Sequence, residues 1–305
     1  MPNLSETKLS IVILNYNTKE LVLDCLTSIK NSQDTDFVIK VIVVDNASTD
    51  NSAEELKKLS WITLIENSTN VGFAKGNNLA LNEIEGDYVW FLNPDTVVEP
   101  NTISFMVSYM DEHPDVGMAT PKLTLPGGRL DKNCHRGFPT PGSSMWHFLG
   151  LDRLFPRSKT LAHYYLGHLP EDQETEVDVI GGSSVLIRKS VGEKVGWWDE
   201  TYFMYGEDIA LAYEVKKLGM KVMYVPQGLI HHYHGASSGL KGTSSTVTKA
   251  TKEVKIRSAA ATISAMSTFY HKYYQGKYHP LVTRLVLATI SFLGMVRILK
   301  LRILG

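Results

Sequence analysis

The chain has 305 residues and a mass of 34.1 kDa, enough for one large α/β domain or two smaller ones. Its 43% hydrophobic and 21% charged residues are typical of globular proteins and exclude a disordered chain, a fibrous repeat and a polytopic membrane protein. Residues 1–240 carry 20 Lys and Arg against 31 Asp and Glu, whereas residues 241–305 carry 11 against a single acid. An acidic body with a basic end predicts that this end faces phosphate groups, on lipid or on nucleic acid.

The cysteine content and the start of the chain predict the cellular compartment. Cys25 and Cys134 are too few for a disulfide framework or a thiolate metal site. Residues 1–8 are polar and lack the basic start and long apolar stretch of a signal peptide. Both features predict a reducing, cytoplasmic location.

The first 120 residues alternate between two periodicities. Apolar, β-branched runs predict strands at 9–14, 37–44, 62–65 and 88–92. Apolar residues at helical spacing predict helices at 21–29, 53–59 and 73–84. Near-continuous apolar strands separated by helices are typical of a parallel sheet covered on both faces, so we expect a Rossmann-like α/β domain.

Periodicity is weaker after residue 120. Residues 121–175 carry turn signals and scattered aromatic residues, which predict an insertion or long loops over the active face. The rest predicts further elements: a strand at 177–188 broken by Gly181 and Gly182, a helix at 209–218, a strand at 221–225 ending at Pro226, and helices at 248–274 and 281–304.

Polar residues follow each of the four predicted strands of the first half. A ligand on such a sheet binds beyond the carboxyl ends of the strands, here Asn15–Asn17, Asp45–Ser48, Asn67–Gly72 and Asn93–Asp95. The first strand is not followed by G-x-G-x-x-G, and the sequence contains no G-x-x-x-x-G-K-[ST]. A dinucleotide oxidoreductase and a P-loop phosphotransferase are therefore disfavoured, whereas a nucleotide held by side chains remains compatible.

Two of these strand-end acids have both a structural and a functional interpretation. Asp45 either caps the following turn or accepts a hydrogen bond from a base or a ribose. Pro94 cannot continue a central ladder, so the chain turns out of the sheet before Asp95. Asp95 is then either a turn residue or a ligand for a hard cation such as Mg²⁺ or Mn²⁺.

Two further clusters lie in the second half. Glu207 and Asp208 precede a predicted helix, where they either cap it or form a carboxylate pair in which burial and like charge raise one pKa toward that of a general base. His231, His232 and His234 lie within four residues, which makes an imidazole metal ligand plausible. The absence of an H-E-x-x-H motif from the sequence argues against a zinc protease.

Taken together, these stretches resemble the family 2 glycosyltransferases, which are inverting, nucleotide-sugar-dependent enzymes of the GT-A fold. The resemblance extends from about residue 9 to residue 237 and depends on seven motifs in the right order: ILNYN (13–17), VVDNASTD (43–50), NVGFAKGNN (70–78), FLNPD (91–95), GGSSVLIRK (181–189), FMYGEDIAL (203–211) and HHYHGAS (231–237). The Asn-Pro-Asp form of the metal motif looks most like the rhamnosyltransferase-type branch that builds bacterial surface polysaccharides.

The resemblance implies an α/β fold of the GT-A type with a mixed central sheet. Residues 1–240 would form the glycosyltransferase domain, with a Rossmann-like nucleotide-sugar-binding half at 1–120 and an acceptor-binding, catalytic half at 121–240. Residues 241–305 would form a basic, helical C-terminal extension.

The resemblance also implies roles for the donor-side residues. Asp45 would contact a pyrimidine base, with Asn15 and Asn17 alongside and Gly72 bordering the nucleotide.

The metal motif departs from the family pattern. Asp95 matches the last acid of the family's D-x-D motif and would bind Mg²⁺ or Mn²⁺ on the donor diphosphate, but Asn93 replaces the first acid. A histidine would then complete the metal site, with His232 as the first choice and His234 as the second.

On the acceptor side, the resemblance makes Asp208 the general base and places Trp198, Asp199 and Glu207 beside the acceptor. The implied reaction is a single in-line displacement that inverts the anomeric carbon. The expected donor is dTDP-L-rhamnose, with UDP-hexoses or UDP-N-acetylhexosamines as alternatives, and the expected acceptor is a hydroxyl of a saccharide or a lipid-linked saccharide.

Three other functions compete with this interpretation. A sugar nucleotidyltransferase is expected to carry a Gly-rich, basic first loop, which residues 14–17 lack. A nucleic-acid-binding module fits poorly with the acidic body and the aliphatic tail, so we expect no nucleic-acid partner. A non-catalytic nucleotide-sugar sensor is expected to lack a base, whereas Asp208 is present.

The basic C-terminal segment contains an uncharged, apolar run at 285–296 flanked by Arg284 and Arg297. This run is short for a membrane crossing, which needs about 20 apolar residues. A helix at 281–304 lying in the lipid interface fits better and predicts a peripheral protein at the inner face of the cell membrane. Packing of this helix on the body or on a second subunit is the alternative.

Overall fold

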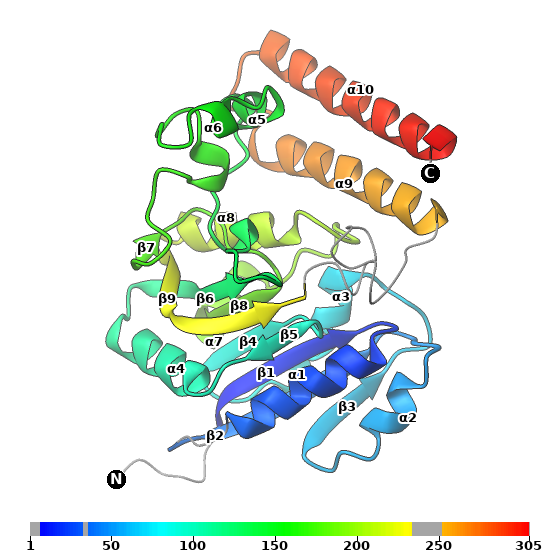
Figure 1. Ribbon diagram of the computed structural model, residues 1–305, viewed down its shortest axis with the longest axis vertical. Helices are drawn as coiled ribbons and strands as arrows, with labels where there is room; N and C mark the ends of the chain where they lie inside the picture. The colour runs from blue at the N-terminus through cyan, green and yellow to red at the C-terminus, as the bar shows by residue number, and fades with distance from the viewer. Residues whose placement is uncertain (1–6, 33–35, 234–251, 305) are drawn as a thin grey trace.

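The computed structural model describes residues 7–32, 36–233 and 252–304. These residues form a mixed sheet of nine strands in the order β3-β2-β1-β4-β8-β6-β9-β5, with β7 paired to β9 (Figure 1). Strands β1 to β4 are mutually parallel, as the strand pattern predicts, whereas β8 runs antiparallel to both β4 and β6. The sheet is therefore mixed, as the family resemblance implies.

The first half follows the predicted alternation closely. Its elements are β1 (Thr7–Asn15), α1 (Lys19–Asn31), β2 (Val38–Asp45), α2 (Ser52–Leu56), β3 (Ile62–Glu66), α3 (Phe73–Asn78), the short 3₁₀ helix η1 (Leu81–Glu83) and β4 (Tyr88–Leu92). The central strands β1 and β4 are buried almost throughout, which explains their near-continuous apolar sequences. The predicted helix at 73–84 is divided in the structure: α3 ends at Asn78, whose side chain donates to the carbonyl of Trp198 at 2.8 Å, and the 3₁₀ turn of η1 follows.

The second half contains elements that the sequence pattern did not predict. Its elements are β5 (Thr96–Val98), α4 (Thr102–Glu112), β6 (Val116–Thr124), η2 (Lys132–Cys134), α5 (Pro141–Phe148), α6 (Leu151–Leu154), η3 (His163–Tyr165), β7 (Thr175–Glu176), β8 (Ser184–Arg188), α7 (Lys189–Val195), α8 (Glu207–Lys217) and β9 (Lys221–His232). The expected division at residue 120 falls inside β6, so both halves share one sheet. The expected boundary at residue 240 lies outside the described residues.

Two predicted strands have different bounds in the structure. The strand expected at 177–188 begins only at Ser184, after the Gly181-Gly182 loop. Strand β9 does not end at Pro226 but continues to His232. Its pairing with β6 jumps from Val225 to Leu229, so the proline lies in a bulge where no ladder hydrogen bond is required of it. This continuation places His232 beside Asp95.

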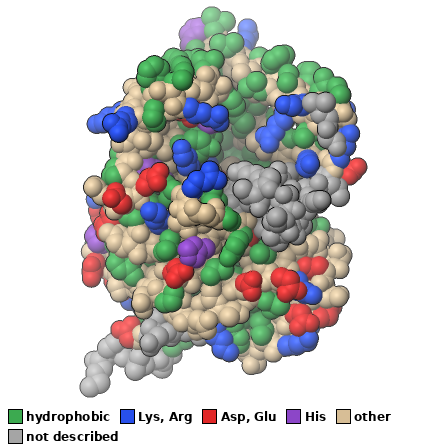
Figure 2. All heavy atoms as spheres, viewed as in Figure 1, with side chains coloured by type: hydrophobic (Ala, Val, Ile, Leu, Met, Phe, Trp, Pro, Cys, Tyr) green, Lys and Arg blue, Asp and Glu red, His purple; other side chains and the backbone are tan. Residues whose placement is uncertain are grey.

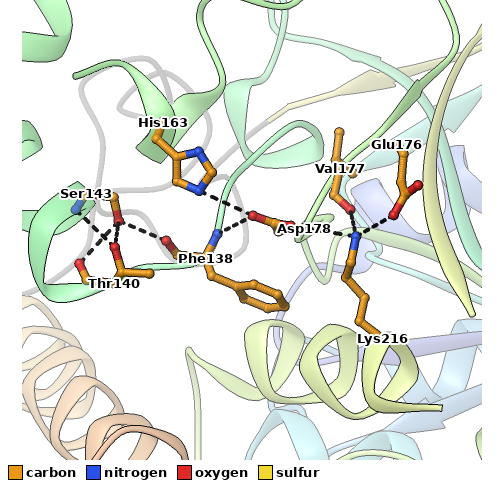
Figure 3. A network of polar contacts seen from close by, with 8 residues as sticks. All are labelled: Phe138, Thr140, Ser143, His163, Glu176, Val177, Asp178 and Lys216. Atoms are coloured by element: carbon orange, nitrogen blue, oxygen red, sulfur yellow. Dashed lines mark hydrogen bonds and ion pairs between the residues drawn. The ribbon is translucent and has the colours of Figure 1, made fainter. Parts of the chain in front are cut away.

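The chain between β6 and β7, residues 125–174, forms a small helical insertion that is fixed to the body by polar contacts (Figure 3). The Asp178 carboxylate accepts from the backbone N–H of Phe138 at 3.1 Å and lies 3.4 Å from Nε2 of His163. Its other oxygen lies 3.6 Å from Nζ of Lys216 on α8. Burial opposes ionisation, but these partners together lower the pKa of Asp178. The segment that leads into α5 is thereby tied to α8.

Helices α9 (Lys252–Tyr273) and α10 (Pro280–Leu304) form an antiparallel pair at one end of the molecule (Figure 1). Helix α9 packs on the body through an aromatic cluster that includes Phe269, Tyr270 and Tyr273 on the helix and Tyr202 on the body. Helix α10 packs on α9, where Gly294 lies against Ile263. The described part of the extension is therefore helical, as expected, and α9 is part of the folded core.

Helix α10 is longer and more apolar than its uncharged run suggests. Residues 280–303 have a mean hydropathy of 1.8 in their most apolar window, and by length and composition alone this helix could cross a membrane. The apolar character continues beyond Arg297 through Ile298, Leu299, Leu301 and Ile303, so the apolar span is longer than the uncharged run at 285–296.

Candidate functional site

The loops that follow β1 and β2 form one hydrogen-bonded unit. The buried Asn15 amide donates to Oδ2 of Asp45 at 2.8 Å, and Oδ1 of Asp45 accepts from the backbone N–H of Ser48 at 2.9 Å. Asn17, with a φ of 53°, accepts at its side-chain oxygen from the backbone N–H of Thr49 at 2.7 Å. Asp45 therefore organises the turn, as its structural interpretation predicts, and its contact with a base stays a prediction.

Gly72, in the loop between β3 and α3, contacts the second half of the chain. Its φ of 90° and its close approach to Phe203 leave no room for a side chain, because a Cβ would lie 2.4 Å from the Phe203 carbonyl oxygen. The same carbonyl accepts from the backbone N–H of Phe73 at 2.7 Å. The start of α3 is thus held directly beside the loop that precedes Glu207 and Asp208.

The loop at 181–183, directly before β8, brings three predicted motifs together. The backbone N–H of Asn93, in the metal motif, donates to the carbonyl of Ser183 at 3.0 Å. A Cβ added to Gly182 would lie 3.4 Å from the Phe73 ring and 3.7 Å from Cβ of Asp208. The nucleotide motif, the metal motif and the predicted base therefore lie around one loop.

Asp95 and His232 meet in the interior next to this loop. Their side chains are 1% and 4% exposed, and Nε2 of His232 lies 3.5 Å from Oδ1 of Asp95. The other ring nitrogen, Nδ1, lies 2.7 Å from Oδ2 of Asp131. Burial lowers the pKa of His232, but the Asp95 and Asp131 carboxylates outweigh it and raise the pKa to about 9. His234 lies outside the described residues.

This arrangement fits a divalent cation whose remaining ligands come from the substrate. Among the described residues no group of three His, Cys, Asp or Glu side chains surrounds a common point, so the protein offers Asp95 and His232 as a pair. Mg²⁺ is commonly held by one or two protein ligands together with substrate phosphates, and neighbouring ligands of such an ion lie about 3 Å apart. Asp131 at Nδ1 directs Nε2 toward Asp95, the usual support of a metal-ligating histidine.

Asp208 forms an ion pair that the sequence did not reveal. Its Oδ2 accepts from Nη2 of Arg136, and the two side chains are 14% and 12% exposed. The Arg136 guanidinium also donates through Nε to the carbonyl of Asn133 at 3.1 Å. Burial opposes the charge on Arg136, but Asp208 raises the pKa of this guanidinium above its usual value. The pair holds the Asp208 carboxylate beside the Gly181-Gly182 loop.

The neighbouring acid, Glu207, has the opposite environment. Its carboxyl group is buried, and burial together with the charge of Asp208 raises its pKa to about 8. Sequence reasoning expected one raised pKa in this pair. The structure raises the pKa of Glu207, whose carboxyl group is buried beside the charge of Asp208.

Glu207→Gln is expected to stabilise the protein at alkaline pH. A native pKa above the unfolded value means that ionisation costs native stability, and this cost grows from about pH 4.5 and is fully present above pH 8. Thermal unfolding of both proteins should therefore show the variant gaining on the wild type as the pH rises from 5 to 8.5. A constant difference over this range would contradict the buried, protonated state of Glu207.

The residues expected beside the acceptor occupy different environments. Trp198 is 1% exposed, and its ring packs edge-on against Phe73 and Phe91. Asp199 forms a 2.7 Å ion pair with Lys272 of α9. Both residues border a groove of about 410 Å³ between α8 and α9.

Sequence reasoning missed Asp131 and Arg136, which contact His232 and Asp208 respectively. Both lie in the aperiodic stretch at 121–175, where no sequence motif distinguishes them from the other charged residues. The one sequence signal for these two residues is the expectation that the stretch at 121–175 lies over the active face.

Comparison with known proteins identifies the family of this chain. Residues 10–192 match the family described as Glycosyl transferase family 2. The chain is 28% identical over 217 residues to an N-acetylglucosaminyl-diphospho-decaprenol L-rhamnosyltransferase of Mycobacterium tuberculosis, covering 67% of this chain and 70% of that protein.

Solved structures share the fold at lower identity. The mannosyltransferase PcManGT of Pyrobaculum calidifontis, in complex with GDP-Man and Mn²⁺, aligns with a TM-score of 0.56 at 16% identity over 99% of this chain and 75% of its own. GalNAc-T7, with UDP, GalNAc and Mn²⁺, aligns with a TM-score of 0.56 at 15% identity over 75% of this chain and 44% of its own. These likenesses show a GT-A fold with added C-terminal helices, and with the family match over more than half of the chain they establish that this protein belongs to glycosyltransferase family 2.

Proposed function

We propose that this protein is an inverting glycosyltransferase that transfers L-rhamnose from dTDP-L-rhamnose to a hydroxyl of a saccharide or lipid-linked saccharide in surface polysaccharide synthesis. The observation that carries the proposal is the convergence of Phe73, Asn93 and Asp208 on the loop at 181–183. The mycobacterial relative named for rhamnosyl transfer supports the choice of sugar. UDP-hexoses and UDP-N-acetylhexosamines are the alternative donors.

In this proposal Asp208 is the general base. The acceptor hydroxyl attacks the anomeric carbon from the face opposite the nucleotide and gives its proton to the Asp208 carboxylate. Arg136 holds this carboxylate in place through their ion pair, while the neighbouring Glu207, whose pKa burial raises to about 8, remains protonated near neutral pH. A single displacement with one base inverts the anomeric configuration and needs no covalent sugar–enzyme intermediate.

The donor is held by the strand-end residues described above. Asp45, Asn15, Asn17 and Gly72 would border the nucleotide, and Asp95 with His232 would hold Mg²⁺ or Mn²⁺ beside the diphosphate. When bound, the metal neutralises the charge that develops on the departing nucleoside diphosphate. His232 must lose its Nε2 proton to act as a ligand, so metal binding would release a proton.

We further propose that the protein works at the cytoplasmic face of the cell membrane through α10. A stripe of apolar side chains on this helix is more than half exposed, at Leu281, Leu285, Phe292, Met295, Leu299 and Ile303. Their spacing of three, four or seven residues places them along one face of the helix. Exposed basic residues flank them, which suits a surface of anionic phospholipid.

The experiment that tests the catalytic proposal is a panel of nucleotide sugars offered with a lipid-linked acceptor. We expect the release of dTDP from dTDP-L-rhamnose to exceed the release of nucleoside diphosphate from UDP-glucose, UDP-N-acetylglucosamine and GDP-mannose. NMR of the product should show an anomeric configuration opposite to that of the donor. Retention of configuration would contradict the single displacement, and preference for a UDP-sugar would favour the alternative donors.

A further inference from the structure

The helical insertion carries a second apolar surface. Five side chains on α5, α6 and the residues that adjoin them are 46–70% exposed, namely Met145, Phe148, Leu149, Leu154 and Phe155. We call this surface the α5–α6 patch. Exposed apolar side chains scattered singly are normal, but a contiguous group marks an interaction surface.

The exposed charged residues of the stretch 141–170, which bears the α5–α6 patch, are basic, and the exposed acids Glu171, Asp172 and Glu174 follow this stretch. Between residues 141 and 170 the exposed basic residues are Arg153, Arg157 and Lys159. The only acid in this stretch is Asp152, which is buried and lies 2.6 Å from Nδ1 of His147. The patch therefore combines exposed apolar groups with positive charge, on a body whose first 240 residues carry an excess of acids.

The α5–α6 patch and α10 lie at the same end of the long axis of the molecule (Figure 1). On the face shown in Figure 2, hydrophobic and basic side chains gather toward this end, and acidic side chains lie mainly farther down. A flat surface at this end could meet both elements at once.

The α5–α6 patch is also anchored to the catalytic body. Thr140 caps α5 by accepting from the backbone N–H of Ser143, and the preceding residue Phe138 is held by Asp178 (Figure 3). Arg136, two residues before Phe138, forms the ion pair with Asp208. The segment that bears the patch thus leads directly to the predicted base.

We propose that the α5–α6 patch is a second membrane-contact surface, which binds the anionic lipid bilayer together with α10 and presents the site to acceptors held in that bilayer. This inference builds on the proposed membrane contact of α10. Apolar side chains inserted among the headgroups, with Lys and Arg at the lipid phosphates, are the usual chemistry of interfacial binding. A second copy of the chain fits less well, because a symmetric contact would bring the same basic residues together.

The test compares full-length variants on vesicles of phosphatidylglycerol and phosphatidylcholine at low ionic strength. Leu154→Ser combined with Phe155→Ser should lower the vesicle-bound fraction, expressed as a partition coefficient, by about tenfold or more. Leu218→Ser, a change at an exposed apolar residue at the end of α8, is the matched control and should bind as the wild type does. Vesicles of phosphatidylcholine alone should retain much less of every protein.

A second pair of changes separates this inference from the proposals on which it builds. Leu285→Ser with Phe292→Ser tests α10 by itself, and turnover with a water-soluble acceptor tests catalysis independently of lipid. Wild-type vesicle binding by the Leu154/Phe155 variant overturns the inference, whatever the α10 variant does. Sedimentation velocity gives the other contradicting result. If the wild type is a dimer, and the Leu154/Phe155 changes dissociate it without affecting vesicle binding, the patch is the contact surface for a second copy of the chain.

Discussion

Asp208→Asn is expected to lower the turnover number by roughly 10²–10⁴, the usual loss when a general base is removed. The amide is nearly isosteric with the carboxylate and can still accept from Arg136, so the fold and donor binding should survive. Steady-state rates of nucleoside diphosphate release would measure the loss, and calorimetry with the donor would measure binding.

A matched control for this change is Asp111→Asn. Asp111 lies on α4 and accepts from the hydroxyl of Tyr88 at 2.6 Å, in the body of the fold. This variant should keep the wild-type turnover number. If Asp208→Asn also kept it, Asp208 would not be the base, and the proposed mechanism would fail at its central step.

Asp95→Asn is expected to have the second large effect. A bound metal supplies several kcal/mol of charge stabilisation in such reactions, so its loss should lower kcat/KM by roughly 10²–10³. The isosteric amide avoids a cavity at a side chain that is 1% exposed. Rates measured across a titration of Mn²⁺ or Mg²⁺ should show a weak metal dependence in the variant and a strong one in the wild type.

Two outcomes would contradict the metal proposal. One is wild-type activity that persists in excess chelator. The other is an Asp95→Asn variant whose metal titration overlays that of the wild type. His232→Gln should weaken metal binding in the same direction, since the glutamine cannot reproduce the Nε2 ligand supported by Asp131.

The sequence by itself determined the nucleotide-binding half of the fold. Strands β1 and β4 are buried on both faces, so their residues must be apolar at nearly every position, and this leaves a pattern that a single sequence displays. The polar residues at the ends of these strands follow from the same topology, because ligands bind where parallel strands end. Family membership was likewise visible in seven ordered motifs, and the comparisons confirm it.

The tertiary structure alone decided how the second half reaches the site. Strand β9 passes Pro226 because a bulge removes the need for its missing N–H, and only this continuation sets His232 between Asp95 and Asp131. Arg136 meets Asp208 across 72 positions of the sequence, and Asp131 meets His232 across 101. Such pairs leave no periodic trace, because a contact between two charged side chains from distant loops imposes no spacing on either segment. The raised pKa of Glu207 was likewise decided by the tertiary structure, because burial of its carboxyl group beside the charge of Asp208 causes it.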